Sequence, residues 1–191
     1  MDNKIIFFGD SLVAGYGLKD PDRESIPALI GAKLKLLNLN YSVINAGTSG
    51  DTTTSAQSRL EHVLHENPAI FVLELGANDF LRGISPVLIL SNLQLIISRV
   101  KSSCPSAAIL LLCIELPDWA TGLHQEDYSG IFPALAAKNG IALVPSFLKN
   151  VAGVRYLNMD DGVHPLREGY QIAAENIWPE LYQIILERET S

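Results

Sequence analysis

Near its amino terminus the sequence runs Ile5-Ile6-Phe7-Phe8-Gly9-Asp10-Ser11-Leu12. Four consecutive apolar residues, two of them β-branched, are typical of a strand buried on both faces. Gly9 ends this strand, and Asp10 and Ser11 lie where the chain must turn towards a helix. The carboxyl end of a buried strand is where open α/β sheets bind ligands. The stretch therefore predicts a nucleophilic serine, Ser11, at the edge of a sheet.

Apolar runs and helical spacing alternate along the rest of the chain. After the last predicted loop, the spacing of apolar residues predicts a final helix that ends near residue 187. Pro179 is predicted to kink or restart this helix, because its ring does not fit an uninterrupted one. The four further predicted strands span residues 41–44, 69–75, 107–114 and 141–144, and the other predicted helices span 27–37, 55–65, 86–101 and 128–138.

Strands that alternate with helices and are almost continuously apolar predict a parallel sheet covered on both faces. Right-handed crossovers then favour a three-layer α/β/α domain. We expect a flavodoxin-like fold with five parallel strands in the order 2-1-3-4-5, which places the first strand beside the point where the winding direction changes. A single domain, residues 1–191, accounts for the whole length.

Composition narrows the possible partners and the compartment. The chain has 48% hydrophobic and 18% charged residues and a formal charge of −7, which argues against binding to nucleic acid or to an anionic membrane. No apolar run approaches the roughly 20 residues of a membrane-spanning helix. The amino terminus lacks a signal-peptide pattern, so we expect a cytoplasmic protein, or a periplasmic or secreted one if a leader was removed. Cys104 and Cys113 are too few for a disulfide framework.

Five chemically useful residues follow the predicted strands. Because the strand-to-helix loops of a parallel sheet emerge at one edge, we expect these residues to converge in space although they are far apart in sequence. They are Ser11, Gly47, Asn78, Asp161 and His164.

These side chains suit nucleophilic catalysis. A serine hydroxyl needs a base to take its proton, and a histidine such as His164 is suited to that work near neutral pH. Asp161 lies three residues before His164, so one turn of chain can aim its carboxylate at the imidazole; Asp160 is the competing partner. The backbone N–H groups of Ser11 and Gly47 and the Asn78 amide are candidate donors to an oxyanion.

Four ordered blocks resemble the SGNH (GDSL) hydrolases. The similarity is closest to the bacterial arylesterase, thioesterase I and lysophospholipase L1 subgroup, and residues 74–83 provide a further match. The four blocks are Gly9-Asp10-Ser11-Leu12, Gly47 within residues 45–51, Gly76-Ala77-Asn78-Asp79 and Asp161-Gly162-Val163-His164-Pro165.

The resemblance implies a triad of Ser11, His164 and Asp161, and an oxyanion hole of Ser11, Gly47 and Asn78. It also implies an α/β/α fold that uses no metal and no cofactor, and a small-molecule ester or thioester as substrate. The sequence does not indicate the oligomeric state.

One loop departs from the subgroup. Where its members have Arg-Leu-Pro followed by a turn like Asn-Tyr-Gly, residues 115–122 read Glu-Leu-Pro-Asp-Trp-Ala-Thr-Gly. In the family this loop borders the acyl pocket, so the acyl-chain preference is open. Leu81, Ile84 and Trp119 are candidates to line an apolar acyl groove; packing that only stabilises the loops is the other interpretation.

The favoured function is therefore a serine esterase acting on short- to medium-chain acyl esters or thioesters. A carbohydrate O-acetylesterase or acyltransferase with the same site is the alternative, and a flavodoxin-like binding module without catalysis is the remote option.

Two other patterns do not indicate a functional site. His62 and His65 are spaced to share a solvated helix face, without a third metal ligand. The segment 15–17 lacks the Lys-Ser/Thr of a phosphate-binding loop.

Overall fold

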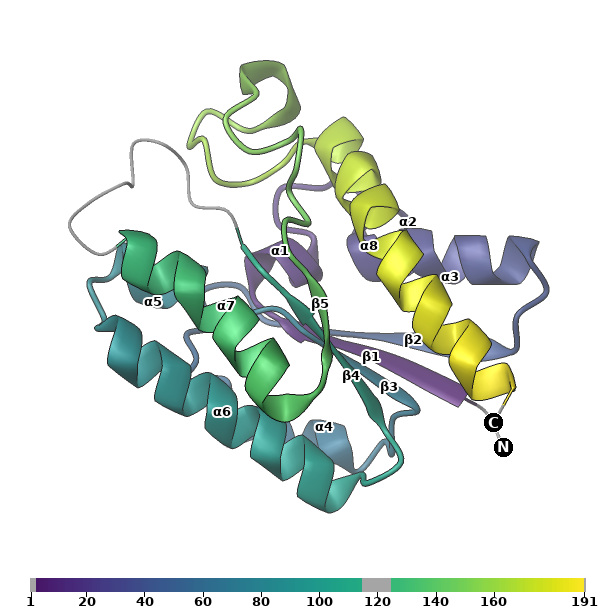
Figure 1. Ribbon diagram of the computed structural model, residues 1–191. Helices are drawn as coiled ribbons and strands as arrows, with labels where there is room; N and C mark the ends of the chain where they lie inside the picture. Colours follow the sequence, from purple (N-terminus) through teal and green to yellow (C-terminus); the bar gives the residue numbers. More distant parts are fainter. Residues whose placement is uncertain (1–2, 115–124, 191) are drawn as a thin grey trace.

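The computed structural model describes residues 3–114 and 125–190. Within these residues the chain forms a five-stranded parallel sheet in the order β2-β1-β3-β4-β5 (Figure 1). The predicted α/β class and the predicted strand order are both confirmed. The strands are β1 (Asn3–Gly9), β2 (Tyr41–Gly47), β3 (Ile70–Leu73), β4 (Ala108–Leu112) and β5 (Ala142–Val144).

Helices cover both faces of the sheet. One face is covered by α1, α3 and α8, and the other by α4, α6 and α7, which gives the three layers visible in Figure 1. The described helices are α1 (Ser11–Ala14), α2 (Pro21–Glu24), α3 (Ile26–Leu36), α4 (Gln57–Leu64), α5 (Ala77–Leu81), α6 (Pro86–Ser103), α7 (Gln125–Asn139), α8 (Arg167–Glu189) and the 3-10 turn η2 (Arg155–Leu157). None of them is long and apolar enough to cross a membrane.

The apolar run of β1 supplies both cores. Successive side chains of a strand point to opposite faces, so Ile5 and Phe7 enter the cluster beneath α3 and α8, while Ile6 and Phe8 enter the cluster beneath α4, α6 and α7. All four side chains are fully buried. A four-residue apolar run at this position is therefore what a central strand requires.

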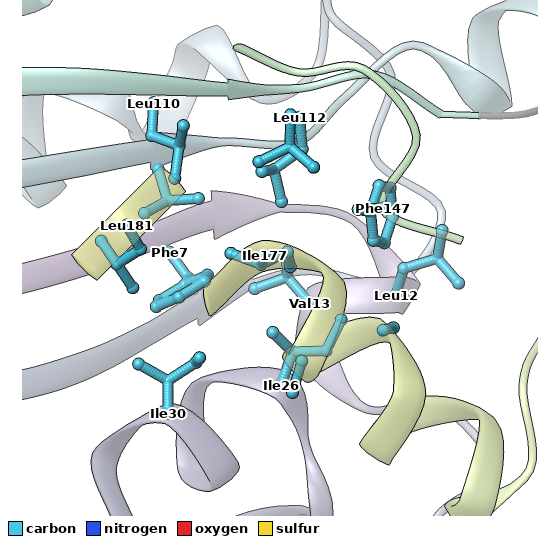
Figure 2. Close-up of a cluster of buried hydrophobic side chains, with 14 of the residues drawn as sticks. Phe7, Leu12, Val13, Ile26, Ile30, Leu110, Leu112, Phe147, Ile177 and Leu181 are labelled. Carbon is cyan, nitrogen blue, oxygen red and sulfur yellow. The ribbon is translucent and has the colours of Figure 1, made fainter. Parts of the chain in front are cut away.

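The α3 and α8 layer is closed by branched aliphatic and aromatic side chains. Figure 2 shows Phe7 of β1 gathered with Ile30 of α3 and with Ile177 and Leu181 of α8. Pro179 lies between these two α8 residues, yet the helix runs without interruption from Arg167 to Glu189, so the predicted restart is wrong. Because Ile177 and Leu181 are both fully buried, their packing holds the helix together across the missing N–H group.

The register of the sheet brings the catalytic candidates together. Gly9 at the end of β1 is paired with Gly47 at the end of β2, and Phe8 is paired with Leu73 at the end of β3. The chain therefore leaves β1, β2 and β3 at one edge of the sheet. Ser11, Gly47 and Asn78 lie at these strand ends or in the chain that follows them. Asp161 and His164 reach the same edge from the segment before α8.

Candidate active site

Ser11 is held at the first position of a single helical turn. Asp10 precedes it and accepts a hydrogen bond from the Leu12 N–H at Oδ1 (3.0 Å), which caps the amino end of α1. Gly15 ends the turn in the left-handed conformation (φ 82°), where a residue without a Cβ is favoured. The Ser11 side chain is 7% exposed, so the hydroxyl lies in a defined position just beneath the surface.

Ser11, His164 and Asp161 form a hydrogen-bonded series. The Oγ atom of Ser11 lies 2.9 Å from Nε2 of His164, and Nδ1 of the same ring lies 2.8 Å from Oδ2 of Asp161. The expected convergence of these three residues is therefore present in the structure. The nitrogen that faces the carboxylate is bonded to Asp161, the residue three positions before His164, rather than to Asp160.

A tight turn aims the Asp161 carboxylate. Its Oδ1 atom accepts the backbone N–H groups of Val163 (2.9 Å) and His164 (3.0 Å), which leaves Oδ2 for the imidazole. Partial burial alone raises the pKa of this carboxyl group, but the bonds from the His164 backbone, the His164 ring and the Val163 N–H outweigh it and hold the pKa below its usual value. Asp161 is therefore ionised in the pH range where a serine hydrolase works.

Two further contacts fix the His164 ring and its loop. The ring of Tyr16 packs against the His164 ring with 4.5 Å between centroids, and the Tyr170 hydroxyl donates to the Tyr16 carbonyl (3.0 Å). The His164 carbonyl accepts the Met159 N–H (2.8 Å). Sequence reasoning missed Tyr16 and Tyr170, because neither spacing nor composition relates residues 16, 164 and 170.

The role predicted for Gly47 needs correction. Its N–H donates to Oδ1 of Asn45 (3.0 Å), so it is not available to an oxyanion. A Cβ at this position would lie 2.3 Å from the backbone nitrogen of Ala14. Gly47 is therefore the glycine that lets the end of β2 pack against α1.

Gly50, unlike Gly47, has a backbone N–H that is available to an oxyanion. It has a positive φ of 83°, and its N–H has no acceptor among the described residues. The carbonyl of the following residue, Asp51, accepts a hydrogen bond from Nδ2 of Asn78 (3.0 Å), so the loop that contains Gly50 passes beside the Asn78 side chain. The carbonyl of Gly50 is itself held by Arg82 (2.9 Å).

Asn78 lies in the first turn of α5, and its side-chain amide is already hydrogen-bonded. Nδ2 donates to Oδ2 of Asp10 (2.9 Å) and to the carbonyl of Asp51 (3.0 Å). An amide nitrogen carries two protons, so both are engaged. Asn78 can donate to an oxyanion only by exchanging one of these bonds.

Arg59 of α4 ties the ends of the first two strands to the loop that follows β2. Its guanidinium donates to the carbonyls of Gly9 (2.8 Å) and Ala46 (2.6 Å) and pairs with Oδ2 of Asp51 (2.7 Å). It also lies over the Phe8 ring, 4.1 Å from the centroid. Sequence reasoning missed Arg59, since a single arginine on a predicted helix usually faces solvent.

Beneath the nucleophile lie two buried carboxyl groups. Asp10 is 1% exposed and Glu74 is fully buried, and Oε2 of Glu74 accepts the Asp10 N–H (3.0 Å). Burial raises the pKa of Asp10 to about 6, even though bonds from Leu12 and Asn78 lower it. Burial, followed by repulsion from Asp10, raises the pKa of Glu74 well above its usual value.

The predicted acyl-groove residues do not form one observed surface. Leu81 is 40% exposed on α5, whereas Ile84 packs against the core beneath α4, α6 and α7. Trp119 lies outside the described residues. His62 and His65 belong to no metal site: within residues 3–114 and 125–190, no three His, Cys, Asp or Glu side chains are grouped to hold a metal ion.

Comparison with known proteins agrees with this geometry. The sequence model of the GDSL-like lipase/acylhydrolase family matches residues 7–172, a span that contains Ser11, Asn78, Asp161 and His164. The chain belongs to the GDSL-like lipase/acylhydrolase family.

Relatives of this GDSL hydrolase extend over nearly the whole chain. Esterase TesA of Pseudomonas aeruginosa is 36% identical over 95% of this chain and 89% of its own length. An arylesterase of Vibrio mimicus is 37% identical over 93% of this chain and 88% of its own length. Thioesterase 1/protease 1/lysophospholipase L1 of Escherichia coli K12 is 34% identical, covering 95% of this chain and 84% of the relative.

The fold of this GDSL hydrolase is also shared with solved structures. A crystal structure of TesA superimposes with a TM-score of 0.89 and 36% sequence identity, covering 95% of this chain and 99% of that one. The three-layer architecture inferred from the sequence is thus the architecture of an experimentally determined relative.

Proposed function

We propose that this protein is a serine esterase that hydrolyses acyl esters and thioesters, with Ser11 as nucleophile, His164 as general base and Asp161 as the residue that orients it. The observation that carries the proposal is the bonded series from Ser11 Oγ through both nitrogens of His164 to Asp161. An unassisted serine hydroxyl is a weak nucleophile, and this arrangement supplies the base and its orientation in the resting protein. Relatives named esterase, arylesterase and thioesterase support the same reaction class.

The reaction proceeds in two halves. Ser11 Oγ bonds to the substrate carbonyl carbon while its proton passes to Nε2 of His164, which lies at hydrogen-bond distance. The tetrahedral intermediate expels the alcohol or thiol, which takes that proton from His164. Water then attacks the acyl-enzyme by the same proton route and releases the carboxylic acid, which restores Ser11.

The developing oxyanion requires donors, and the structure supports a revised set. The N–H of Ser11 lies at the amino end of α1, where backbone donors lack intrahelical acceptors. The Gly50 N–H replaces Gly47 as the second donor, since it has no acceptor within the described residues. Asn78 joins them when its amide leaves Asp51 or Asp10 and turns towards the oxyanion.

A hydrolysis panel tests the proposal. p-Nitrophenyl esters of increasing chain length, an acyl-CoA, a lysophospholipid and an acetylated sugar are assayed with the wild-type protein and with the Ser11→Ala variant. We expect turnover of aryl or acyl-chain substrates by the wild type and loss of that turnover in the variant. Preferential turnover of the acetylated sugar would favour an O-acetylesterase, and no turnover of any ester by folded protein would contradict the proposal.

A further inference from the structure

Glu74 occupies a site that the chemistry above does not use. It directly follows β3 and is fully buried, with Oε2 accepting the Asp10 N–H and Oε1 without a hydrogen-bond partner. A Cβ at Gly9 would lie 2.5 Å from Oε2 of Glu74, so the end of β1 packs directly against this carboxyl group and position 9 has room only for glycine. A carboxyl group placed so closely against the residues before the nucleophile has a defined orientation.

Asp10 connects Glu74 to the reacting groups. Its Oδ1 atom lies 3.4 Å from Ser11 Oγ, and its Oδ2 atom accepts from Nδ2 of Asn78 (2.9 Å). The bond from the Asp10 N–H to Oε2 of Glu74 joins the two residues directly, and the two carboxyl groups repel one another electrostatically when both are ionised. Glu74 therefore acts on both the nucleophile and a predicted oxyanion donor through one intermediate residue.

The charges around the pair decide its protonation. In the described part of the chain neither Asp10 nor Glu74 takes part in an ion pair, and the nearby guanidinium of Arg59 is bonded to Asp51 and to backbone carbonyls instead. The other titratable groups that interact with the pair are His164, with Asp10, and the buried hydroxyls of Tyr128 and Tyr170, with both carboxyl groups. Two neighbouring buried carboxylates without a cation are strongly unfavourable, so the pair retains a proton. Asp10 accepts hydrogen bonds from the Leu12 N–H and from Nδ2 of Asn78, which stabilise its ionised form, so Glu74 holds the proton.

We propose that Glu74 is a positioning residue for hydrolysis: as a neutral acid it accepts the Asp10 N–H without adding a second negative charge beside Asp10, and thereby fixes Ser11 and Asn78 for the reaction. Without Glu74, the Asp10 N–H would lose its acceptor, and the buried Asp10 carboxylate would be free to shift towards Ser11. The inference rests on the proposed esterase function, since its kinetic consequences are measured on ester hydrolysis.

Two substitutions separate the neutral-acid role from simple filling of space. Glu74→Gln keeps a neutral donor and an acceptor of nearly the same shape, so we expect kcat close to that of the wild type. Glu74→Leu fills the space without either, and we expect kcat to fall about 10- to 100-fold with KM nearly unchanged, as for other residues that orient a reacting group. Glu61→Gln, an exposed change on α4, is the matched control.

A spectroscopic readout is independent of activity. The infrared difference spectrum between wild type and Glu74→Gln at pH 7 should contain the carbonyl band of a protonated carboxyl group. Absence of that band, a Glu74→Gln variant as slow as Glu74→Leu, or a folded Glu74→Leu variant as fast as the wild type would each overturn the inference. Failure of the wild type itself to hydrolyse any ester would instead overturn the proposed function, and the infrared band would still test the protonation of Glu74.

Discussion

Oγ of Ser11 and Nε2 of His164 lie 2.9 Å apart, although 153 positions separate the two residues in the chain. The distance is short because β1 lies inside the sheet, between β2 and β3, and the segment before α8 returns to its carboxyl edge. The proton of Ser11 can therefore pass to His164 without a conformational change. The tests below follow from this contact and from the groups around it.

The acid limb of the pH profile reports the protonation of Asp10. Burial raises the pKa of Asp10 to about 6, and this carboxyl group must be ionised to hold Asn78. As the pH falls through about 6, Asp10 becomes protonated and its bond to the Asn78 amide weakens. We therefore expect kcat/KM to fall between about pH 7 and pH 5, about one pH unit on either side of this pKa. A flat profile down to pH 5, with circular dichroism showing folded protein, would contradict this.

Stability should depend on pH through Glu74. This group is protonated in the folded protein, while in the unfolded chain it ionises above its ordinary pKa of 4.5, so unfolding releases a proton. The free energy of unfolding therefore falls as pH rises, by about 1.4 kcal/mol per pH unit, until Glu74 ionises in the folded protein. Urea unfolding at pH 5, 6 and 7 measures the slope. In Glu74→Gln the slope should be smaller, and equal slopes would show that Glu74 is ionised in the fold.

Gly47 and Gly50 should respond differently to a methyl group. In Gly47→Ala the new Cβ meets the Ala14 backbone, so we expect a loss of about 3 kcal/mol or more in the free energy of unfolding. Gly50→Ala has space, with Arg82 at 3.6 Å, and incurs only the cost of a positive φ, about 1–2 kcal/mol. Gly130→Ala, inside α7 with nothing within 4 Å, is the control and should stabilise by up to about 1 kcal/mol. A Gly47→Ala variant as stable as the wild type would refute the packing role.

Asn78→Ala tests whether the Asn78 amide exchanges its bonds during the reaction. If it donates to the oxyanion, kcat should fall about 10²- to 10³-fold while KM changes little. Asn92→Ala, which removes an amide bonded to Thr53 and Thr54, controls for general loosening of the same edge. Unchanged kcat in Asn78→Ala would remove this residue from the mechanism and leave it the structural role of holding Asp51 and Asp10.

The sequence was enough to predict the strand order and the convergence of Ser11, Asp161 and His164. The hydrophobic periodicity predicts the alternating strands and helices, and in a parallel sheet of this topology the loops after the strands all lie at one edge. It did not distinguish Gly47 from Gly50. Both lie in one sequence block, Gly47 at the end of β2 and Gly50 in the loop after it, and only the position of the Asn45 side chain shows which N–H is bonded.

Buried polar pairs were harder to predict. Glu74 interrupts an apolar run, which is a sequence signal for a buried acid, but its partner Asp10 is 64 positions away and only the register of β1 and β3 joins them. Pro179 shows the converse case. A local rule predicted a break, and the packing of α8 against the sheet was the stronger effect.

The central claim is that Ser11 is the nucleophile, and labelling with a fluorophosphonate probe tests it most directly. We expect intact-mass and peptide analysis to show one adduct per chain on Ser11, formed at a rate that falls with esterase activity as the pH is lowered. Ser11→Ala should remain unlabelled, and Ser91→Ala, an exposed change on α6, should label as the wild type does. Folded protein that stays unlabelled, or a Ser11→Ala variant that keeps both adduct and activity, would contradict the account.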